Sequence, residues 1–347
     1  MKKVICLFTA LLILSLICAP ALYVSADDAS PLSFTALEDN SGVIVKIIGE
    51  GTYSLEYATG GEWIGVVFDE NGSFALEMQK DETVLFRGNN TMSFGMTDYL
   101  SFDGMGKLEV TGDITTLLDP AGNVETLADG TGFYKLFAGN TALVSASGLI
   151  LPSSVLSASC YDSMFMGCEN LESAPALPAL TLAPYCYANM FNGCKNLKKA
   201  PDLPAQTLAN GCYSGMFAGC IAMGGSPNLP AAELVRYCYT DMFNGCSSLS
   251  GIKVAFTEWD ANDAATQNWL GGVSEMFFFD CPVALEEFSS ESRIPNGATI
   301  THDGIAESVY AQGSVLSEGN TLTIVIIAGI AALAIVLLVV LKKTKKI

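Results

Sequence analysis

A twelve-residue phrase, written four times at a fixed spacing, constrains this chain more than any other feature. The copies CYDSMFMGCENL, CYANMFNGCKNL, CYSGMFAGCIAM and CYTDMFNGCSSL begin at Cys160, Cys186, Cys212 and Cys238, so the period is 26 residues. A second phrase recurs between them as APALPALTLA, APDLPAQTLA and SPNLPAAELV. A fixed period of about 20–50 residues indicates stacked structural repeats, so the sequence predicts a solenoid.

Each repeat is predicted to hold a short helix followed by a short strand. In the second copy, Cys186, Met190 and Phe191 fall on one apolar face at helical spacing. Gly193 follows, where the left-handed end of a helix favours glycine. Leu197 then begins an inward-facing strand that a proline turn closes. Stacking would bury Leu197 against the same position of its neighbours at about 4.8 Å, the spacing between strands.

Weaker copies of the phrase flank the four. Residues 136–143 keep the frame, with Asn140 where the later copies have cysteine, and residues 276–281 repeat the phrase once more. Degenerate units are expected at the ends of an array, because end rungs must cap the core against water. We therefore expect about six rungs, and we expect the Asn140 side chain to bond to the backbone of its turn.

The pattern CYxxMFxGCxxL followed by APxLPAxTLA resembles the BspA-like leucine-rich repeat proteins of prokaryotic cell surfaces. The resemblance covers roughly residues 130–300, and the segments around Trp269, Cys281 and Arg293 look like the C-terminal closure of such arrays. It implies an α/β leucine-rich repeat solenoid with a binding or adhesive role. It implies no catalytic residues, because the repeat motif of the family carries none.

The segment before the repeats, residues 27–130, lacks the 26-residue period. Short stretches alternate apolar and polar residues, with glycine turns between them, around Val45, Leu55, Leu76 and Val84. Such stretches predict a small, sandwich-like all-β domain. Trp63 would either face a ligand or, as is more usual, pack in the sandwich.

The two ends of the chain predict export and anchoring. Lys2 and Lys3, an apolar run and Val24-Ser25-Ala26 together indicate a signal peptide over residues 1–26. Residues 322–341 carry no charge and, as a helix, would span about 30 Å, one bilayer core. A lysine-rich tail, 342–347, would remain in the cytoplasm.

The predicted organisation is thus a leader, a β-rich domain, a solenoid over 131–300, a stalk over 301–321, one transmembrane helix and a short tail. We expect a single-pass protein of the cell membrane with its N-terminal part outside. Asn71 and Asn89 fit the pattern for glycan attachment in such a part.

The charge of the chain argues against nucleic acid as a partner. It has 36 acidic and 17 basic residues and a net charge of −19, and six of the basic residues lie in the predicted leader and tail. A surface with this charge repels nucleic acid and anionic lipid. Solubility is a sufficient reason for such a surface.

Eight cysteines form two columns along the repeats, listed by position as Cys160, Cys186, Cys212 and Cys238, and Cys168, Cys194, Cys220 and Cys246. Zinc is disfavoured because the spacing is wide and His302 is the only histidine. Disulfides are compatible with an extracellular protein, either within a repeat, as Cys186 with Cys194, or between rungs, as Cys168 with Cys194. A buried ladder of thiols is favoured, because the columns face the core and Cys281 makes the count odd.

The sequence holds no recognisable catalytic constellation. His302 stands in a polar stretch, and no GxSxG-like nucleophile accompanies it. Asp98, Asp103 and Asp113 lack the spacing of a calcium-binding loop. We therefore expect no enzymatic activity, no metal and no cofactor.

The outer face of the solenoid varies while its core does not. Lys195, Lys198 and Lys199 in one rung stand opposite Glu169 and Glu172 in the rung before. Such a face offers an extended surface for a protein or a glycan.

Three functions remain after these observations. The sequence favours a membrane-anchored surface protein that mediates adhesion or binds an extracellular protein or glycan. The alternative is a structural envelope or surface-layer component that associates with itself. An enzyme with its activity in the N-terminal β segment is the least favoured.

Overall fold

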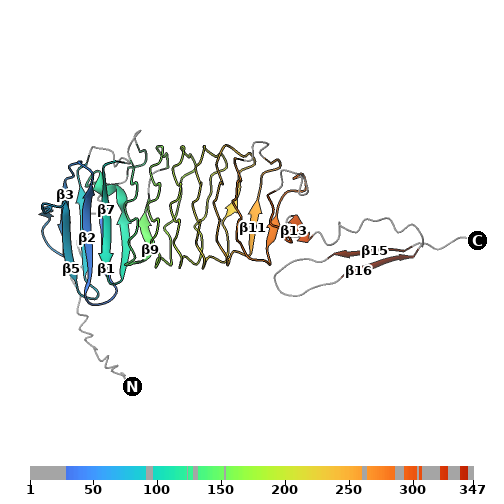
Figure 1. The fold of residues 1–347 in the computed structure, drawn as a ribbon, viewed down its shortest axis with the longest axis horizontal. Coiled ribbons are helices and arrows are strands. Elements are labelled where there is room, and N and C mark those ends of the chain that lie inside the picture. Colours follow the sequence, from blue (N-terminus) through green and yellow to red (C-terminus); the bar gives the residue numbers. More distant parts are fainter. Residues whose placement is uncertain are drawn as a thin grey trace, which may run out of the picture.

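The computed structural model describes residues 29–90, 97–122, 124–127, 132–151, 154–259, 264–285 and 293–302, and three further strands near the C-terminus. It shows one elongated body, with a β-sandwich at one end and a stack of rungs behind it (Figure 1). The predicted leader, residues 1–26, lies outside the described residues.

Two sheets form the sandwich. One has the strand order β4-β3-β6-β1-β8-β9 and the other the order β5-β2-β7. Phe34 from the first sheet stacks on Phe102 from the second, with 5.4 Å between ring centroids, so the sheets pack face to face. The strands are β1 (Leu32–Ala36), β2 (Ser41–Ile48), β3 (Leu55–Ala58), β4 (Ile64–Gly65), β5 (Ser73–Met78), β6 (Thr83–Gly88), β7 (Tyr99–Met105), β8 (Leu108–Asp113) and β9 (Leu143–Ile150). The alternating stretches of the sequence fall on β2, β3, β5 and β6.

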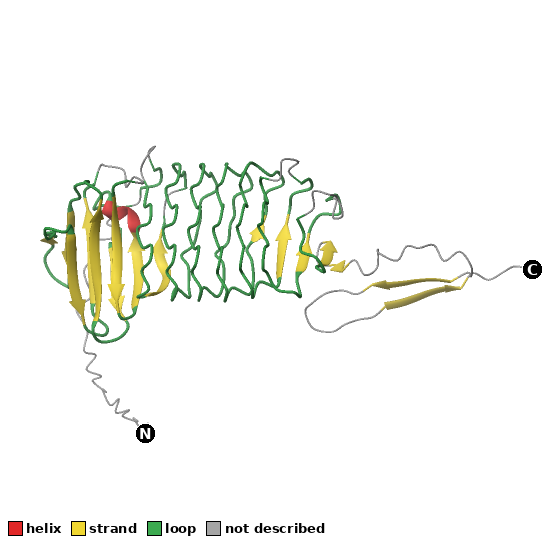
Figure 2. Ribbon diagram, viewed as in Figure 1, coloured by secondary structure: helices red, strands yellow, loops and turns green. Residues whose placement is uncertain are grey.

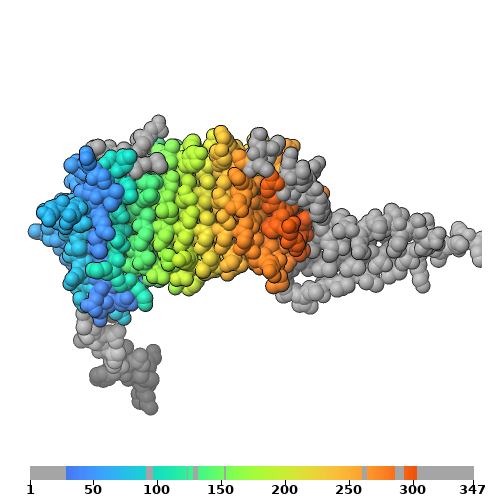
Figure 3. Space-filling view, viewed as in Figure 1, coloured from blue at the N-terminus to red at the C-terminus, as the bar shows by residue number. Residues whose placement is uncertain are grey.

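Both sheets continue into the first rung of the stack. On one side, β8 pairs with β9 in parallel. On the other, the Phe102 N–H of β7 donates to the Leu136 carbonyl at 2.7 Å. Figure 3 shows no cleft at this junction on the face in view. The sandwich therefore closes one end of the solenoid, and a single hydrophobic core runs through both.

The predicted α/β solenoid with a short helix in each repeat is wrong. The repeat phrase folds as a series of turns, drawn as loop in Figure 2. In the first copy, the Met164 N–H donates to the Tyr161 carbonyl three residues back at 3.3 Å. The next residue, Phe165, donates instead to Met190 in the following rung at 2.9 Å. Among the described residues, the only helical element is a 3-10 turn, η1 (Ile114–Leu117).

The backbone conformation explains why no helix forms. Every fourth residue of the phrase is left-handed: φ is 55° at Ser159, 57° at Ser163 and 75° at Gly167. A right-handed helix cannot continue through such residues. The chain therefore makes one four-residue turn after another, and half of its N–H groups bond to the next rung. A period of four lies close to the helical 3.6, so the two give similar apolar patterns.

The strand part of each repeat is present, but its regularity varies along the stack, from β9 in the first rung through single bridges to short paired strands. Single parallel bridges join Ser145, Ser173, Lys199 and Gly225 in successive rungs. Paired strands follow as β10 (Asn228–Leu229), β11 (Gly251–Val254), β12 (Phe278–Asp280), β13 (Thr299–His302) and β14 (Ile305–Ala306). The stack thus extends past residue 300, where we expected a stalk to begin, through β13 to β14.

The predicted transmembrane helix over 322–341 is also wrong. Two strands, β15 (Thr321–Ile326) and β16 (Leu337–Lys342), occupy parts of this range and pair antiparallel. Within the described portion of the chain, we find no helix with the length and apolar character that crossing a bilayer requires. An uninterrupted run of apolar residues does not by itself distinguish a helix from strands, because it has no periodicity that only one of them would show.

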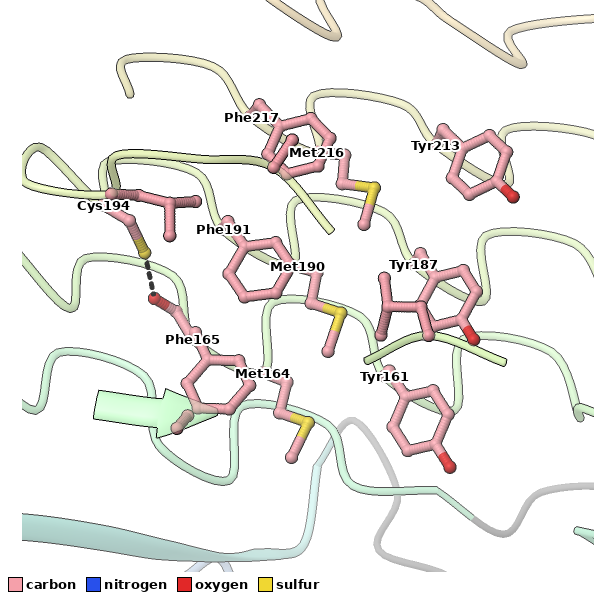
Figure 4. Close-up of a cluster of buried hydrophobic side chains, with 14 of the residues drawn as sticks. Tyr161, Met164, Phe165, Tyr187, Met190, Phe191, Cys194, Tyr213, Met216 and Phe217 are labelled. Carbon is pink, nitrogen blue, oxygen red and sulfur yellow. Dashed lines mark hydrogen bonds between the residues drawn. The ribbon is translucent and has the colours of Figure 1, made fainter. Parts of the chain in front are cut away.

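Identical side chains stack through the rungs in columns (Figure 4). Phe165, Phe191 and Phe217 lie 5.4 Å and 5.7 Å apart between centroids, with their rings within 6° of parallel. Tyrosines form a second column, which ends on Trp269. Trp269 donates its indole N–H to the Arg293 carbonyl at 3.0 Å, which fixes the cap at the far end of the stack.

Candidate functional site

The inner cysteine column is a ladder of hydrogen bonds inside the core. Each thiol donates to the carbonyl of a phenylalanine in the preceding rung: Cys168 to Phe137, Cys194 to Phe165, Cys220 to Phe191 and Cys246 to Phe217, at 3.0–3.1 Å. Figure 4 shows the bond from Cys194. Each of these carbonyls also accepts a backbone N–H, as Phe165 does from Cys168 at 3.0 Å, so the thiol adds a second bond that ties consecutive rungs together.

Asn140 occupies the cysteine position in the first rung, and its side chain makes three hydrogen bonds. Its Nδ2 donates to the Phe102 carbonyl of β7 at 3.1 Å. Its Oδ1 accepts from the N–H groups of Ala142 and Leu143 at 3.0 and 3.2 Å. The side chain is fully buried. It therefore joins the sandwich to the solenoid and bonds to its own turn, as the sequence predicted.

The outer column, Cys160, Cys186, Cys212 and Cys238, is buried as well. All nine described cysteines are thiols rather than disulfides. No cluster of metal-binding side chains occurs among the residues that the structure describes.

The thiols of both columns are poorly suited to chemistry. Burial raises the pKa of the Cys160 and Cys246 thiols to about 12, and it raises the pKa of Cys194 and Cys220 well above the ordinary value. A reactive cysteine needs a thiolate in an electropositive and accessible place. The cysteine columns therefore belong to the core and not to a site.

The other residues that the sequence singled out do not meet in one place. Trp63 is half-buried beneath Arg87, whose guanidinium lies 4.1 Å from the ring centroid. His302 is buried on β13, with its Nδ1 2.9 Å from the Cys281 carbonyl oxygen. Neither side chain faces an open site.

The three aspartates are likewise separate. Asp98 accepts from the Glu50 N–H at 2.7 Å, which lowers the pKa of its carboxyl group. Asp103 forms an ion pair with Lys46 at 3.0 Å. Asp113 is the N-cap of η1 and accepts from the Thr115 N–H at 2.8 Å. Each carboxylate supports a local turn or pair.

The structure contains a groove on the solenoid that the sequence analysis did not predict. It has a volume of about 640 Å³ and lies mainly on two rungs, with residues 172–178 on one and 198–202 and Pro204 on the next, while Ser147 reaches it from the rung before. These ranges hold the second repeated phrase, APALPA and APDLPA. Four prolines line the groove, Pro175, Pro178, Pro201 and Pro204. Because proline has no N–H and a fixed φ, these walls are rigid and largely apolar.

Polar groups stand along the same groove. Ser147 and Ser173 come from two successive rungs, and Lys199 from the third. Glu172 and Lys198 form an ion pair across the rungs. Lys199 is exposed, and no carboxylate of a described residue pairs with it. The groove thus combines apolar walls with the ammonium group of Lys199, the exposed carboxylate of Asp202 and hydroxyls, which is the composition of a binding groove.

The second phrase was the signal that would have revealed this groove. Its prolines recur at two positions in successive rungs, so they form two rows on the surface, as the cysteines form two columns inside. The sequence analysis assigned the phrase only to the proline turn that ends each repeat. It did not predict that two adjacent copies of the phrase line a groove.

Comparison with known proteins gives no match. No protein-family model matches the chain, and neither a curated protein nor a solved structure matches it.

Proposed function

We propose that this protein is a non-catalytic binding protein of the cell surface, whose solenoid holds an extended protein or glycan ligand in the groove over residues 172–178 and 198–204. The groove itself carries this proposal, because it combines rigid apolar walls with an unpaired Lys199. The resemblance of the repeats to BspA-like surface proteins agrees with it.

The construction of the stack also supports a role in display. The buried columns hold every rung in one shape, while exposed positions change from rung to rung. The Lys195–Glu169 pair at 2.7 Å lies between the same two rungs as the groove and keeps this part of the face in register. A rigid surface loses little conformational entropy when a ligand binds.

We place the solenoid outside the cell, at the cell surface. Extracellular conditions favour oxidation of thiols. Burial of all nine described cysteines, together with the raised pKa of the Cys160 and Cys246 thiols, protects them there.

A second candidate is a structural surface component that binds its own copies. The specific observation in its favour is three exposed apolar side chains in the last rungs, Met276, Phe278 and Val283, with 81%, 54% and 77% of their surface accessible. Exposed apolar groups of this kind mark contacts between proteins when they lie together.

Binding of the purified full-length protein to arrays of extracellular proteins and glycans tests the proposal. We expect at least one ligand whose binding falls tenfold or more in Lys199→Glu and is unchanged in Lys80→Glu, a control on the sandwich. If no ligand binds and the protein forms oligomers at micromolar concentration, the second candidate replaces the first.

A further inference from the structure

One row of residues on the solenoid adopts a conformation that its side chains disfavour. The residue just before the first cysteine of each phrase is left-handed, with φ of 55° at Ser159, 56° at Tyr185, 62° at Gly211 and 61° at Tyr237. Glycine adopts this conformation freely, but a bulky side chain there is a rare outlier. Such outliers concentrate at functional sites. The four-residue turns impose this conformation on the row, so the two tyrosines adopt it at a conformational cost that glycine would not have.

The ring of Tyr185 lies on the backbone of the next rung. A methyl group built on Gly211 would meet two carbon atoms of this ring at 2.3 and 2.4 Å. Gly211 is buried, whereas 41% of Tyr185 remains exposed. The Tyr185 ring thus packs directly on the backbone of Gly211, where no side chain is in the way. The rest of the ring is a rigid aromatic surface that faces solvent.

The following rung carries a cationic side chain, Arg236. The Gly211 N–H donates to the backbone carbonyl of Arg236 at 3.0 Å, so the backbone under the Tyr185 ring is bonded directly to the backbone of Arg236. The Arg236 guanidinium lies 4.6 Å from the Tyr237 ring centroid and donates to the Tyr237 hydroxyl at 2.7 Å. Among the described residues, no carboxylate lies within ion-pair distance of Arg236. Tyr237 therefore holds the guanidinium in place and leaves its charge available.

We propose that Tyr185 and Arg236 form a binding site for one acidic sugar residue of a glycan. The apolar C–H face of a pyranose ring stacks on Tyr185, as apolar groups pack on an aromatic face. The sugar carboxylate accepts hydrogen bonds from the Arg236 guanidinium, whose planar fork matches it. The site is separate from the proline-lined groove and goes beyond the function proposed for that groove.

The charge of the protein narrows the ligand further. With a net charge of −19, the chain repels a polyanion as a whole, even where one arginine is exposed. A single carboxylate on an otherwise neutral glycan meets Arg236 without that repulsion. The expected ligand is therefore a neutral chain that carries an isolated acidic sugar, and not a sulfated or uniformly acidic polysaccharide.

Calorimetric titration of the full-length protein with three probes tests this site. We expect sialyllactose or a glucuronate-terminated disaccharide to bind, lactose to bind at least tenfold more weakly, and heparin not to compete. In Arg236→Gln the preference for the acidic probe over lactose should disappear.

Substitution of the tyrosine separates binding from folding. Tyr185→Gly removes the ring and also the disfavoured conformation, so the thermal midpoint should stay the same or rise while the affinity for the acidic probe falls at least tenfold. Ile221→Ala, a change at another exposed apolar position of the solenoid, should alter neither.

Equal affinity of Tyr185→Gly and the unchanged protein for the acidic probe would overturn the site, as would preference for heparin. The groove has its own readout in Lys199→Glu. A protein that binds an array ligand through Lys199 but ignores every acidic sugar would therefore refute this site and leave the proposed function standing.

Discussion

The sandwich and the solenoid share one core but fill it in different ways. In the sandwich, Phe86 meets Phe34 and Phe102 edge-on, with interplanar angles of 85° and 76°. In the solenoid, the same residue recurs in each rung and the rings lie nearly parallel, at 3° between Phe191 and Phe217. The sandwich core thus combines edge-on rings with a stacked pair, Phe34 on Phe102, from different positions of its strands, whereas the columns of the solenoid repeat one position.

The two regions also satisfy their buried backbone differently. Antiparallel strands pair with each other in the sandwich, as β2 does with β5 and β7. The turns of the solenoid add side-chain hydrogen bonds to their backbone bonds, and the thiols from Cys168 to Cys246 supply the donors. No cysteine occurs between residues 19 and 159. The solenoid should therefore respond more strongly than the sandwich to conditions that ionise thiols.

Alkaline pH should give the largest effect and separate the two regions. Burial raises the pKa of the Cys160 and Cys246 thiols to about 12, against 9.0 in the unfolded chain. Below pH 9 their stabilising contribution is complete, and it is lost as pH rises towards 12, because the unfolded chain ionises first. Each thiol loses about 1.4 kcal/mol per pH unit, so the seven column thiols whose pKa is raised by burial lose about 10 kcal/mol by pH 10. This is comparable to the whole stability of a typical domain.

Hydrogen exchange followed from pH 8 to pH 11 measures this loss region by region. Protection of the turns over 160–250 should collapse before that of β1 and β6. The double variant with Cys168→Ala and Cys194→Ala should lose stability with pH about a quarter less steeply. A slope that stays the same in this variant would show that the thiols do not control the transition.

Phe137→Ala should break the junction itself. The Phe137 ring lies 6.1 Å from both Phe34 and Phe102 of the sandwich and 5.1 Å from Phe165 of the next rung. Loss of a buried phenylalanine costs about 3–5 kcal/mol. Because this ring belongs to both regions, we expect calorimetry to show two unfolding transitions where the unchanged protein shows one. Phe243→Ala, in a rung far from the sandwich, should lower the midpoint and keep a single transition.

Asn140→Ala should weaken the same junction by about 2–3 kcal/mol, since it leaves the Phe102 carbonyl and two N–H groups buried without their partner. Asn140→Cys converts the first rung to the chemistry of the later ones and should recover part of the loss through a thiol donor. Urea titration of the three proteins measures the order. Equal stability of the alanine and cysteine variants would mean that a donor at this position contributes nothing.

The predictions from sequence were right where a periodicity is compatible with only one kind of secondary structure. Strict alternation around Val45 and Leu76 has few solutions besides strands, and β2 and β5 form there. The 26-residue period likewise gave the stack, the rows of equivalent residues and the burial of both cysteine columns. The role of Asn140 followed from its place in that register.

The predictions were wrong where a period of four was taken for 3.6. Cys160, Met164 and Cys168 recur every fourth residue, and both a helix and a chain of turns place them on one side. The residues between these apolar positions distinguish a helix from a chain of turns. In the third copy, Gly211, Gly215 and Gly219 also recur every fourth residue, where a helix would lose stability at each glycine and a left-handed turn needs it. The groove was missed for a related reason, since it depends on two adjacent rungs and no single repeat contains it.

The left-handed positions give the smallest effect and the most direct test of this correction. Gly219 has φ of 74°, and a methyl group added there would meet Gly193 at an ordinary 3.7 Å. Space is therefore sufficient, and Gly219→Ala should cost about 1–2 kcal/mol through its backbone conformation alone. In an α-helix the same change would stabilise the protein by up to about 1 kcal/mol. The sign of the effect in urea titration thus distinguishes turns from a helix.

Gly224→Ala is the matched control within the same rung. Gly224 is exposed, and no atom lies within 4 Å of an added methyl group. Because its φ lies outside the left-handed range, alanine there should leave the stability unchanged or raise it slightly, by restricting the unfolded chain. Equal effects at both glycines would remove the conformational argument. A loss at Gly219 alone ties the stability of the solenoid to its four-residue turns, which the sandwich, built on alternation, does not share.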